Sequence, residues 1–215
     1  CALPISVFGV VLGNRGVFPE HLVQKGRERV LKALDAAGYG AVVLPADNGT
    51  HGSVKTRREA DACAALFREH RDEIDGILVT LPNFGDEKSI AHAIRSAGLN
   101  VPVLLHAFPD ELGRLDIDNR ADAFCGKMSA ANNLRQYGVK YTNTRVHTEA
   151  PEAAEFSADL DAFARICRVV RGVHGARFGA IGARVAPFNT VRYSEKLLEA
   201  SGISVETVDL SEIIA

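Results

Sequence analysis

The chain has 215 residues, of which 47% are hydrophobic and 24% are charged, and its formal net charge at pH 7 is −2. This composition is typical of a globular protein with a sizeable core, and the slight negative charge argues against nucleic acid or an anionic membrane surface as a partner. No apolar run approaches the ~20 residues of a membrane-spanning helix, and the first residues lack the charged-then-apolar pattern of a signal peptide, so we expect a cytoplasmic protein.

The four cysteines are far apart in the sequence, at positions 1, 63, 125 and 167. They form no Cys-x-x-Cys pair, and no histidine stands near them at the spacing of a metal site, so we expect reduced thiols and no bound metal. Cys63 and Cys167 fall on the apolar faces of predicted helices, where they are expected to fill the core.

The first 150 residues alternate between short apolar runs and longer amphipathic stretches. Strands are predicted at residues 5–12, 41–44, 76–81, 101–105 and 139–142, and helices at residues 19–37, 56–74, 86–97 and 121–137. Thr56 and Glu59 have the capping-box spacing that begins the second helix. Strands that alternate with helices in this way predict an α/β fold, a doubly wound parallel sheet of the flavodoxin or Rossmann type.

Residues 152–171 form the strongest predicted helix, with apolar residues at heptad spacing, acidic residues early and arginines late. Gly172 and Gly175 are expected to form a linker after it. The pattern then starts again, with strands at residues 178–183 and 203–210, a helix at residues 190–201, and Ser211 as the N-cap of a further helix. We therefore expect a flavodoxin-like domain at 1–150, a connecting helix and linker at 151–175, and the incomplete beginning of a second α/β domain at 176–215, as in a fragment of a longer protein.

Hydrogen-bonding side chains follow the predicted strands, at the edge where open parallel sheets bind ligands. The residues at these strand ends are Asn14, Arg15, Asp47, Asn48, His51, Asn83, Phe84, His106, Asn143 and Arg145. Such a set suits a polyhydroxylated ligand such as a sugar. Turns also favour asparagine and aspartate for backbone reasons, so a purely structural role stays open.

Other chemistry finds less support in the sequence. The glycines at positions 175, 179 and 182 lack the spacing of a dinucleotide site, and no Walker sequence occurs, so no nucleotide cofactor is expected. Cys125 lies near a predicted helix N-terminus beside Lys127, a setting that activates thiols, and a cysteine-dependent amidotransferase-like hydrolase is one alternative. A non-catalytic sugar-binding module is another.

Two stretches resemble the superfamily of L-fucose isomerase and L-arabinose isomerase, and in particular its fucose-isomerase-like branch. Residues 124–138 read FCGKMSAANNLRQYG and are similar to the FCGK and NNL-x-QYG segment of that family. Residues 179–192 carry the second stretch, and residues 80–87, TLPNFGDE, add support. Together these segments span most of the chain, and their combination is more specific than any one of them.

The resemblance implies an aldose–ketose isomerase that acts on a free sugar through an enediol, with Mn²⁺ or a similar divalent ion stabilising the developing oxyanion. Its metal ligands and catalytic residues would lie beyond Ala215, so the resemblance assigns none of them to this chain. It further implies a homo-oligomer, a trimer or hexamer, in which the first domain reaches into a neighbouring subunit's active site. Arg15, Asn83 and Phe84 are the expected substrate-binding residues, and Lys127 is expected to be structural.

Overall fold

A computed structural model describes residues 6–214 of the chain. The chain divides into two compact units, Cys1–Cys167 and Arg168–Ala215, which are treated separately below. Cys1 and Ile5, which the sequence assigns to a reduced thiol and to the start of the first strand, lie outside the described residues.

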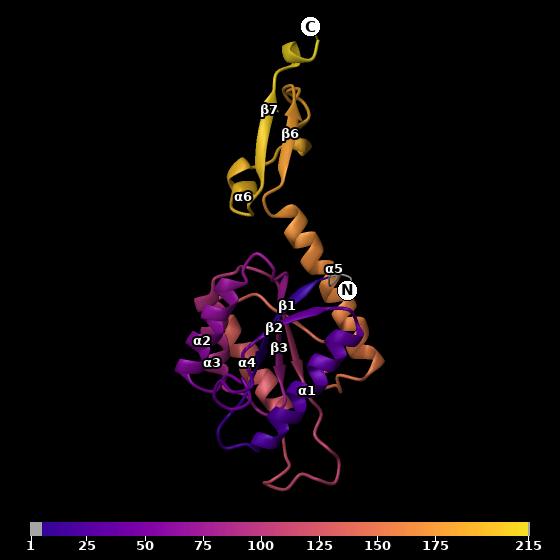
Figure 1. Ribbon diagram of the computed structural model, residues 1–215. Coiled ribbons are helices and arrows are strands. Elements are labelled where there is room, and N and C mark those ends of the chain that lie inside the picture. The colour runs from indigo at the N-terminus through magenta and orange to yellow at the C-terminus, as the bar shows by residue number, and fades with distance from the viewer. Residues whose placement is uncertain (1–5, 215) are drawn as a thin grey trace. The chain divides into compact units, whose positions relative to one another are not determined.

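The first unit is built on a parallel sheet of five strands (Figure 1). The strands are β1 (Val7–Leu12), β2 (Gly40–Val43), β3 (Gly76–Leu81), β4 (Val103–Ala107) and β5 (Thr142–Asn143), and their order across the sheet is β2-β1-β3-β4-β5. β1 pairs with both β2 and β3, and Leu12 lies opposite Thr80. The order of strands therefore reverses at β1 and β3, so the loops that leave these two strands lie next to each other at the carboxyl edge, which is where doubly wound sheets bind ligands.

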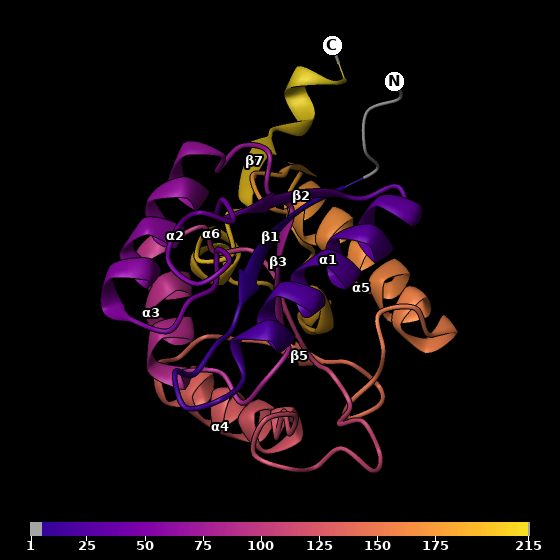
Figure 2. The same cartoon turned by 60° about the horizontal axis from the view of Figure 1, so that its bottom comes forward.

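Helices cover both faces of this sheet, as Figure 2 shows. The helices α2 (Arg57–Glu69), α3 (Glu87–Ala97) and α4 (Ala123–Gln136) pack on one face, and α1 (Glu20–Ala36) and the first part of α5 (Ala154–Val173) pack on the other. Because successive side chains of a strand point to opposite faces, Ile77 and Val79 join the core under α2 and α3, whereas Leu78 joins Leu34 and Phe163 in the core under α1 and α5. The expected doubly wound α/β fold is confirmed.

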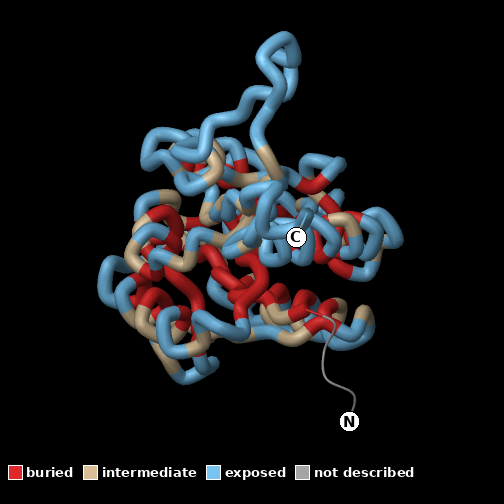
Figure 3. The backbone as a smooth tube through the Cα atoms, turned by 90° about the horizontal axis from the view of Figure 1, so that it is seen from above, coloured by how far each residue is buried: buried red, intermediate tan, exposed pale blue. Residues whose placement is uncertain are grey.

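Because helices cover both faces of the sheet, a central strand is buried on both sides. All six residues of β3 are buried. In Figure 3 the buried stretches gather inside the first unit and exposed stretches surround them. Cys63 and Cys167 belong to the two cores, one to each, as expected for core residues. Burial raises the pKa of both thiols to about 12, so they stay protonated at neutral pH.

The start of α2 is as predicted from the sequence. The end of α2 and the bounds of the fifth strand differ from the prediction. Thr56 accepts a hydrogen bond from the backbone N–H of Glu59, whose carboxylate accepts one from the backbone N–H of Thr56, so the predicted capping box is confirmed. α2 ends at Glu69, five residues before the predicted end. The fifth strand comprises Thr142 and Asn143 rather than residues 139–142, because the N–H of Val139 bonds the carbonyl of Leu134 and closes the end of α4.

The second unit contains a two-stranded parallel sheet of β6 (Arg177–Ile181) and β7 (Ser204–Val208). The linker predicted at Gly172 is wrong, because this residue lies within α5, which ends at Val173. The helix predicted at residues 190–201 is divided into η1 (Asn189–Val191) and α6 (Glu195–Glu199), since Ser194 is extended and caps a helix that begins after it.

The last turn of the second unit is also capped by a different residue than predicted. η2 (Leu210–Glu212) begins after Asp209, whose carboxylate accepts hydrogen bonds from the N–H and hydroxyl of Ser211. Ser211 therefore lies inside the turn and does not cap it. Within the described part of this unit Ile203 is the one buried residue, so most of the apolar side chains of its sheet and helix are exposed.

Candidate functional site

Two buried asparagines join the loops that follow β1 and β3. The side-chain amide of Asn83 donates a hydrogen bond of 2.9 Å to Oδ1 of Asn14, and that of Asn14 donates one of 3.2 Å to Oγ of Ser53. Asn14 and Asn83 are both fully buried. An unpaired amide would be costly at this depth, so this chain of hydrogen bonds holds three loops at the carboxyl edge in one arrangement.

Asn83 also fixes the backbone on which Arg15 stands. Its Oδ1 accepts hydrogen bonds from the backbone N–H groups of Arg15, at 3.2 Å, and Gly85, at 3.1 Å. Asn83 thus positions the loops through both ends of its amide group. A direct contact between this amide and a sugar stays a prediction.

The guanidinium of Arg15 lies over the ring of Phe84. Its Cζ atom is 4.5 Å from the ring centroid, its Nε donates a hydrogen bond of 3.0 Å to the carbonyl of Gly85, and its guanidinium forms an ion pair with Glu87 in the first turn of α3. These contacts hold the planar group in one orientation. About 30% of the Arg15 side chain remains exposed, and its Nη1 group donates no hydrogen bond to any residue in the described range.

A second aromatic ring extends this surface. Phe18 stacks on Phe84 with ring centroids 5.6 Å apart and planes inclined by 25°. Phe18 also lines an open hollow of about 660 Å³ between the loop after β1 and the loop that contains Arg114, and the other residues lining the hollow include His21, Lys25 and Asn119. Aromatic faces beside fixed hydrogen-bond donors can bind a ligand that has both apolar C–H faces and hydroxyl groups, as a sugar does.

The FCGK segment supports this site through its glycine. Gly126 lies in the first turn of α4, directly against the loop after β3. A Cβ atom at this position would lie 1.9 Å from the carbonyl oxygen of Phe84, far inside van der Waals contact. Only glycine therefore allows α4 to approach the backbone of Phe84 this closely.

Lys127 holds the loop that follows β5. Its ammonium donates hydrogen bonds of 2.6 Å to Oγ1 of Thr144 and 3.0 Å to the carbonyl of His147, and the residue is 4% exposed. Burial lowers the pKa of Lys127 to about 8, against the opposite effects of the carboxylates of Glu149 and Asp159. Its donors are used within the chain, which is a structural role.

His106, at the end of β4, is buried and neutral. Its Nε2 is 2.9 Å from the carbonyl of Glu149, which can only accept, so Nε2 carries the proton and Nδ1 accepts from the hydroxyl of Thr80 at 2.8 Å. Burial lowers the pKa of His106 to about 3. The ring fastens the loop after β5 to β4 and does not reach the carboxyl-edge surface, since it is 0% exposed.

Of the residues predicted at the strand ends, the structure brings four together, namely Asn14, Arg15, Asn83 and Phe84. Asp47, Asn48 and Asn143 form no side-chain hydrogen bond or ion pair with any other residue in the described range, and Arg145 pairs with Asp159 instead. Sequence reasoning missed Phe18, Ser53 and Glu87. Glu87 could have been found from its place in the TLPNFGDE segment, whereas nothing in the sequence marked Phe18.

Cys125 has no partner within the described part of the chain that would activate it as a nucleophile. The thiol is free, exposed and in the first turn of α4. Across residues 6–214 no side chain forms a hydrogen bond or ion pair with it. A cysteine hydrolase needs a base within hydrogen-bond reach, so the described contacts lend this alternative no support.

The described residues provide no metal centre and no membrane-spanning helix. Among them no three His, Cys, Asp or Glu side chains lie close enough together to hold a metal ion. None of the helices in the described range is both long and apolar enough to cross a membrane.

One family of known proteins matches this chain over most of its length. The family model for the N-terminal domain of fucose/sulfoquinovose isomerase matches residues 9–174, which include all of the five-stranded sheet except the first two residues of β1, the Arg15 surface and the FCGK segment. No curated protein sequence matches the chain significantly. The resemblance found in residues 124–138 is thus supported by a match that covers the first unit from residue 9 onward, and the chain belongs to the fucose/sulfoquinovose isomerase family, whose N-terminal domain it contains.

Proposed function

We propose that this chain is the N-terminal part of an aldose–ketose isomerase that acts on a free sugar through an enediol. The family match supports the reaction class. The observation that carries the role of this chain is the Arg15 guanidinium, held over Phe84 at the topological switch point of the sheet. This surface offers a sugar an aromatic face together with fixed hydrogen-bond donors.

In the proposed enzyme the chain binds and orients the sugar and does not move its protons. The exposed part of the Arg15 side chain donates to sugar hydroxyls, the stacked pair of Phe18 and Phe84 contacts the C–H groups of the sugar, and Asn83 keeps the backbone of Arg15 in place. The reaction is proposed to use Mn²⁺ or a similar divalent ion. The proposal assigns no metal ligand and no catalytic acid or base to this chain.

The Arg15 surface is proposed to serve the active site of a neighbouring subunit in a homo-oligomer, a trimer or hexamer. The partial exposure of Arg15 supports a contact with groups that this chain does not itself supply. We further propose the division into a flavodoxin-like domain (1–150), a connecting segment (151–175) and the beginning of a second α/β domain (176–215). A cytoplasmic location is proposed from the composition and from the cysteine pattern.

The test is the interconversion of free aldoses and ketoses by the native polypeptide with Mn²⁺. Arg15→Ala is expected to lower kcat/KM at least about tenfold, because it removes charge-assisted hydrogen bonds to the substrate. Arg58→Ala is the matched control, since Arg58 is an exposed arginine on α2 with no side-chain partner among residues 6–214. The isolated 215-residue chain is expected to show no turnover.

Three outcomes would each overturn a part of this proposal. If the native polypeptide converts none of a broad panel of free aldoses, the reaction class is wrong. If it is an isomerase but Arg15→Ala and Arg58→Ala behave alike, the surface at the switch point does not bind the sugar. Turnover by the isolated chain would show that the catalytic groups had been placed wrongly.

A further inference from the structure

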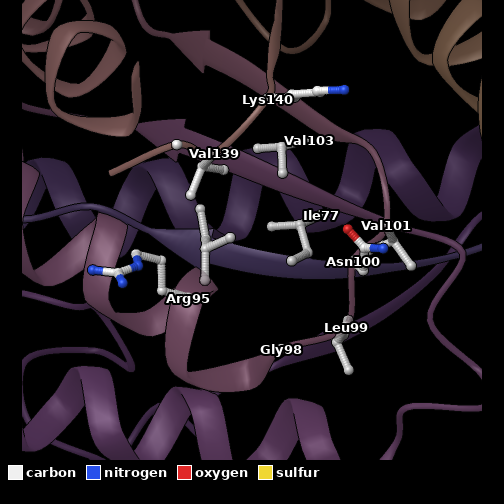
Figure 4. Close-up of a pocket in the computed structure, with 11 residues that line it drawn as sticks. Ile77, Arg95, Gly98, Leu99, Asn100, Val101, Val103, Val139 and Lys140 are labelled. Carbon is white, nitrogen blue, oxygen red and sulfur yellow. The ribbon is translucent and has the colours of Figure 1, made fainter. Parts of the chain in front are cut away.

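A second cavity lies at the opposite, amino-terminal edge of the sheet in the first unit (Figure 4). It has a volume of about 310 Å³ and lies between the start of β3 and β4 and the ends of α3 and α4. Arg15 and Asn83 follow the carboxyl ends of β1 and β3 in the same parallel sheet, so this cavity is distinct from the proposed sugar site. Its volume is in the range of cavities that hold small molecules.

The floor of the cavity is apolar. Ile77, Ile94 and Val103 line it and are each at most 7% exposed. Figure 4 shows Ile77, Val103 and Val139 around a common space. A ligand that fills this space would therefore remove apolar surface from water.

The rim of the cavity is cationic. Arg95 and Lys140 lie at two different margins of the space in Figure 4, and of the described residues that line the cavity none is acidic. The guanidinium of Arg95 lies 5.0 Å from the ring centroid of Tyr137, but neither Arg95 nor Lys140 forms a side-chain ion pair or hydrogen bond with any residue from 6 to 214. Their positive charges are thus not compensated by a carboxylate of this part of the chain.

Asn100 adds a polar group at a third margin. It has a positive φ of 56°, a backbone conformation that asparagine adopts more readily than most residues. Its side chain is exposed and forms no hydrogen bond within the described residues. An amide that can both donate and accept is thus available at a margin separate from those of Arg95 and Lys140, as Figure 4 shows.

We propose that this cavity binds a small molecule that combines an apolar body with one carboxylate. The apolar floor accepts the body, and the planar guanidinium of Arg95 matches a carboxylate in a bidentate manner, with Lys140 adding attraction from the other margin. A neutral molecule would form no ion pair with Arg95 or Lys140, and a cationic molecule would be repelled by both. The proposal goes beyond the isomerase function and does not depend on it.

The test uses the whole 215-residue chain and three probes of one length, which are hexanoate, hexanol and hexylammonium. Binding is followed by the amide chemical shifts of Gly98, Asn100 and Gly138 in two-dimensional NMR. Hexanoate is expected to give saturable shifts at these amides and to bind at least about tenfold more tightly than hexanol, whereas hexylammonium gives none. Equal binding of hexanoate and hexanol, shifts confined to other regions, or no saturable shift at millimolar hexanoate would each overturn the proposal.

Variants of the rim separate recognition of the charge from simple partition into an apolar cavity. Arg95→Gln and Lys140→Gln should fold, because both side chains are exposed. Arg95→Gln is expected to abolish the preference for hexanoate over hexanol, and Lys140→Gln to reduce it. Arg135→Gln is the matched control, since Arg135 is an exposed arginine of α4 that does not line the cavity. If the preference survives in Arg95→Gln as in Arg135→Gln, the carboxylate assignment is wrong.

Discussion

Replacement of Glu149 by glutamine is expected to stabilise the chain above neutral pH. Glu149 is 5% exposed, and neither of its carboxylate oxygens has a hydrogen-bond partner among the described residues. Burial raises the pKa of Glu149 from 4.5 to about 7; the carboxylates of Asp159 and Glu155 raise it as well, whereas the cations of Lys127 and Arg145 lower it. An ionised carboxylate at this site therefore costs stability.

The size of the effect follows from the two pKa values of Glu149. They differ by about 2.5 between the unfolded and folded states, which corresponds to about 3 kcal/mol. Between pH 4.5 and pH 7 the folded protein keeps a proton that the unfolded protein has lost, so the free energy of unfolding falls as the pH rises through this window. This contribution is fully present below the lower value and lost above the higher one. The Glu149→Gln variant has no such loss.

The assay is urea denaturation followed by far-UV circular dichroism, for wild type and Glu149→Gln, from about pH 4.5 to about pH 8. His106 has the opposite effect, because burial lowers its pKa from 6.5 to about 3 and stability therefore rises with pH between these values. This contribution is shared by both proteins and cancels in their difference. The stability of Glu149→Gln relative to wild type is expected to increase by about 3 kcal/mol across the range.

The control for this experiment is Glu69→Gln, which removes an exposed carboxylate from α2 and is expected to leave the pH dependence unchanged. Parallel curves for Glu149→Gln and wild type would refute the reasoning. A titration midpoint near the ordinary value for the ¹³C-labelled carboxyl of Glu149 in NMR would refute it independently.

Three further substitutions test the packing around the FCGK segment and α5. Gly126→Ala is expected to destabilise the first unit by about 3 kcal/mol or more in thermal unfolding, because its Cβ would meet the carbonyl of Phe84; an unchanged Tm would contradict this contact. Gly172→Ala has the opposite sign, about 0.5–1 kcal/mol of stabilisation, since this helical position has no neighbour within 4 Å. Lys127→Met is expected to raise the pKa of Glu149 above about 7 in the ¹³C titration, and a lower midpoint would exclude an electrostatic effect of Lys127.

The layered fold could be predicted because its signals are local. Apolar runs of strand length, the capping box at Thr56 and the periodicity of the helices are properties of a few neighbouring residues, and they predict the α/β alternation directly. The errors fall where two local signals compete. Val139 has strand propensity, but its N–H closes α4 and is lost to the sheet, and Ser194 begins a helix later than the apolar pattern predicts.

Residues of the candidate site could be predicted from the sequence, but their contacts with one another could not. Arg15, Asn83 and Phe84 follow predicted strands and match a family pattern. Both properties can be recognised in the sequence alone. That Asn83 bonds Asn14, 69 residues away, and holds the backbone of Arg15 depends on the adjacency of β1 and β3. Strand order is a long-range property, and no neighbouring residues encode it.

The burial of Glu149 is the clearest case of a property that depends on tertiary structure and not on neighbouring residues. Glu149 stands in a polar stretch of the sequence, and nothing in that stretch marks it as a buried carboxylate. Tertiary packing against β4 and α5 removes the water and places Lys127 and Asp159 nearby, and these changes move its pKa to about 7. The pattern of apolar residues along the chain thus determines which elements form and which faces they bury. The environment of each polar group depends on which distant elements meet there, because desolvation and charge act through space and not along the sequence.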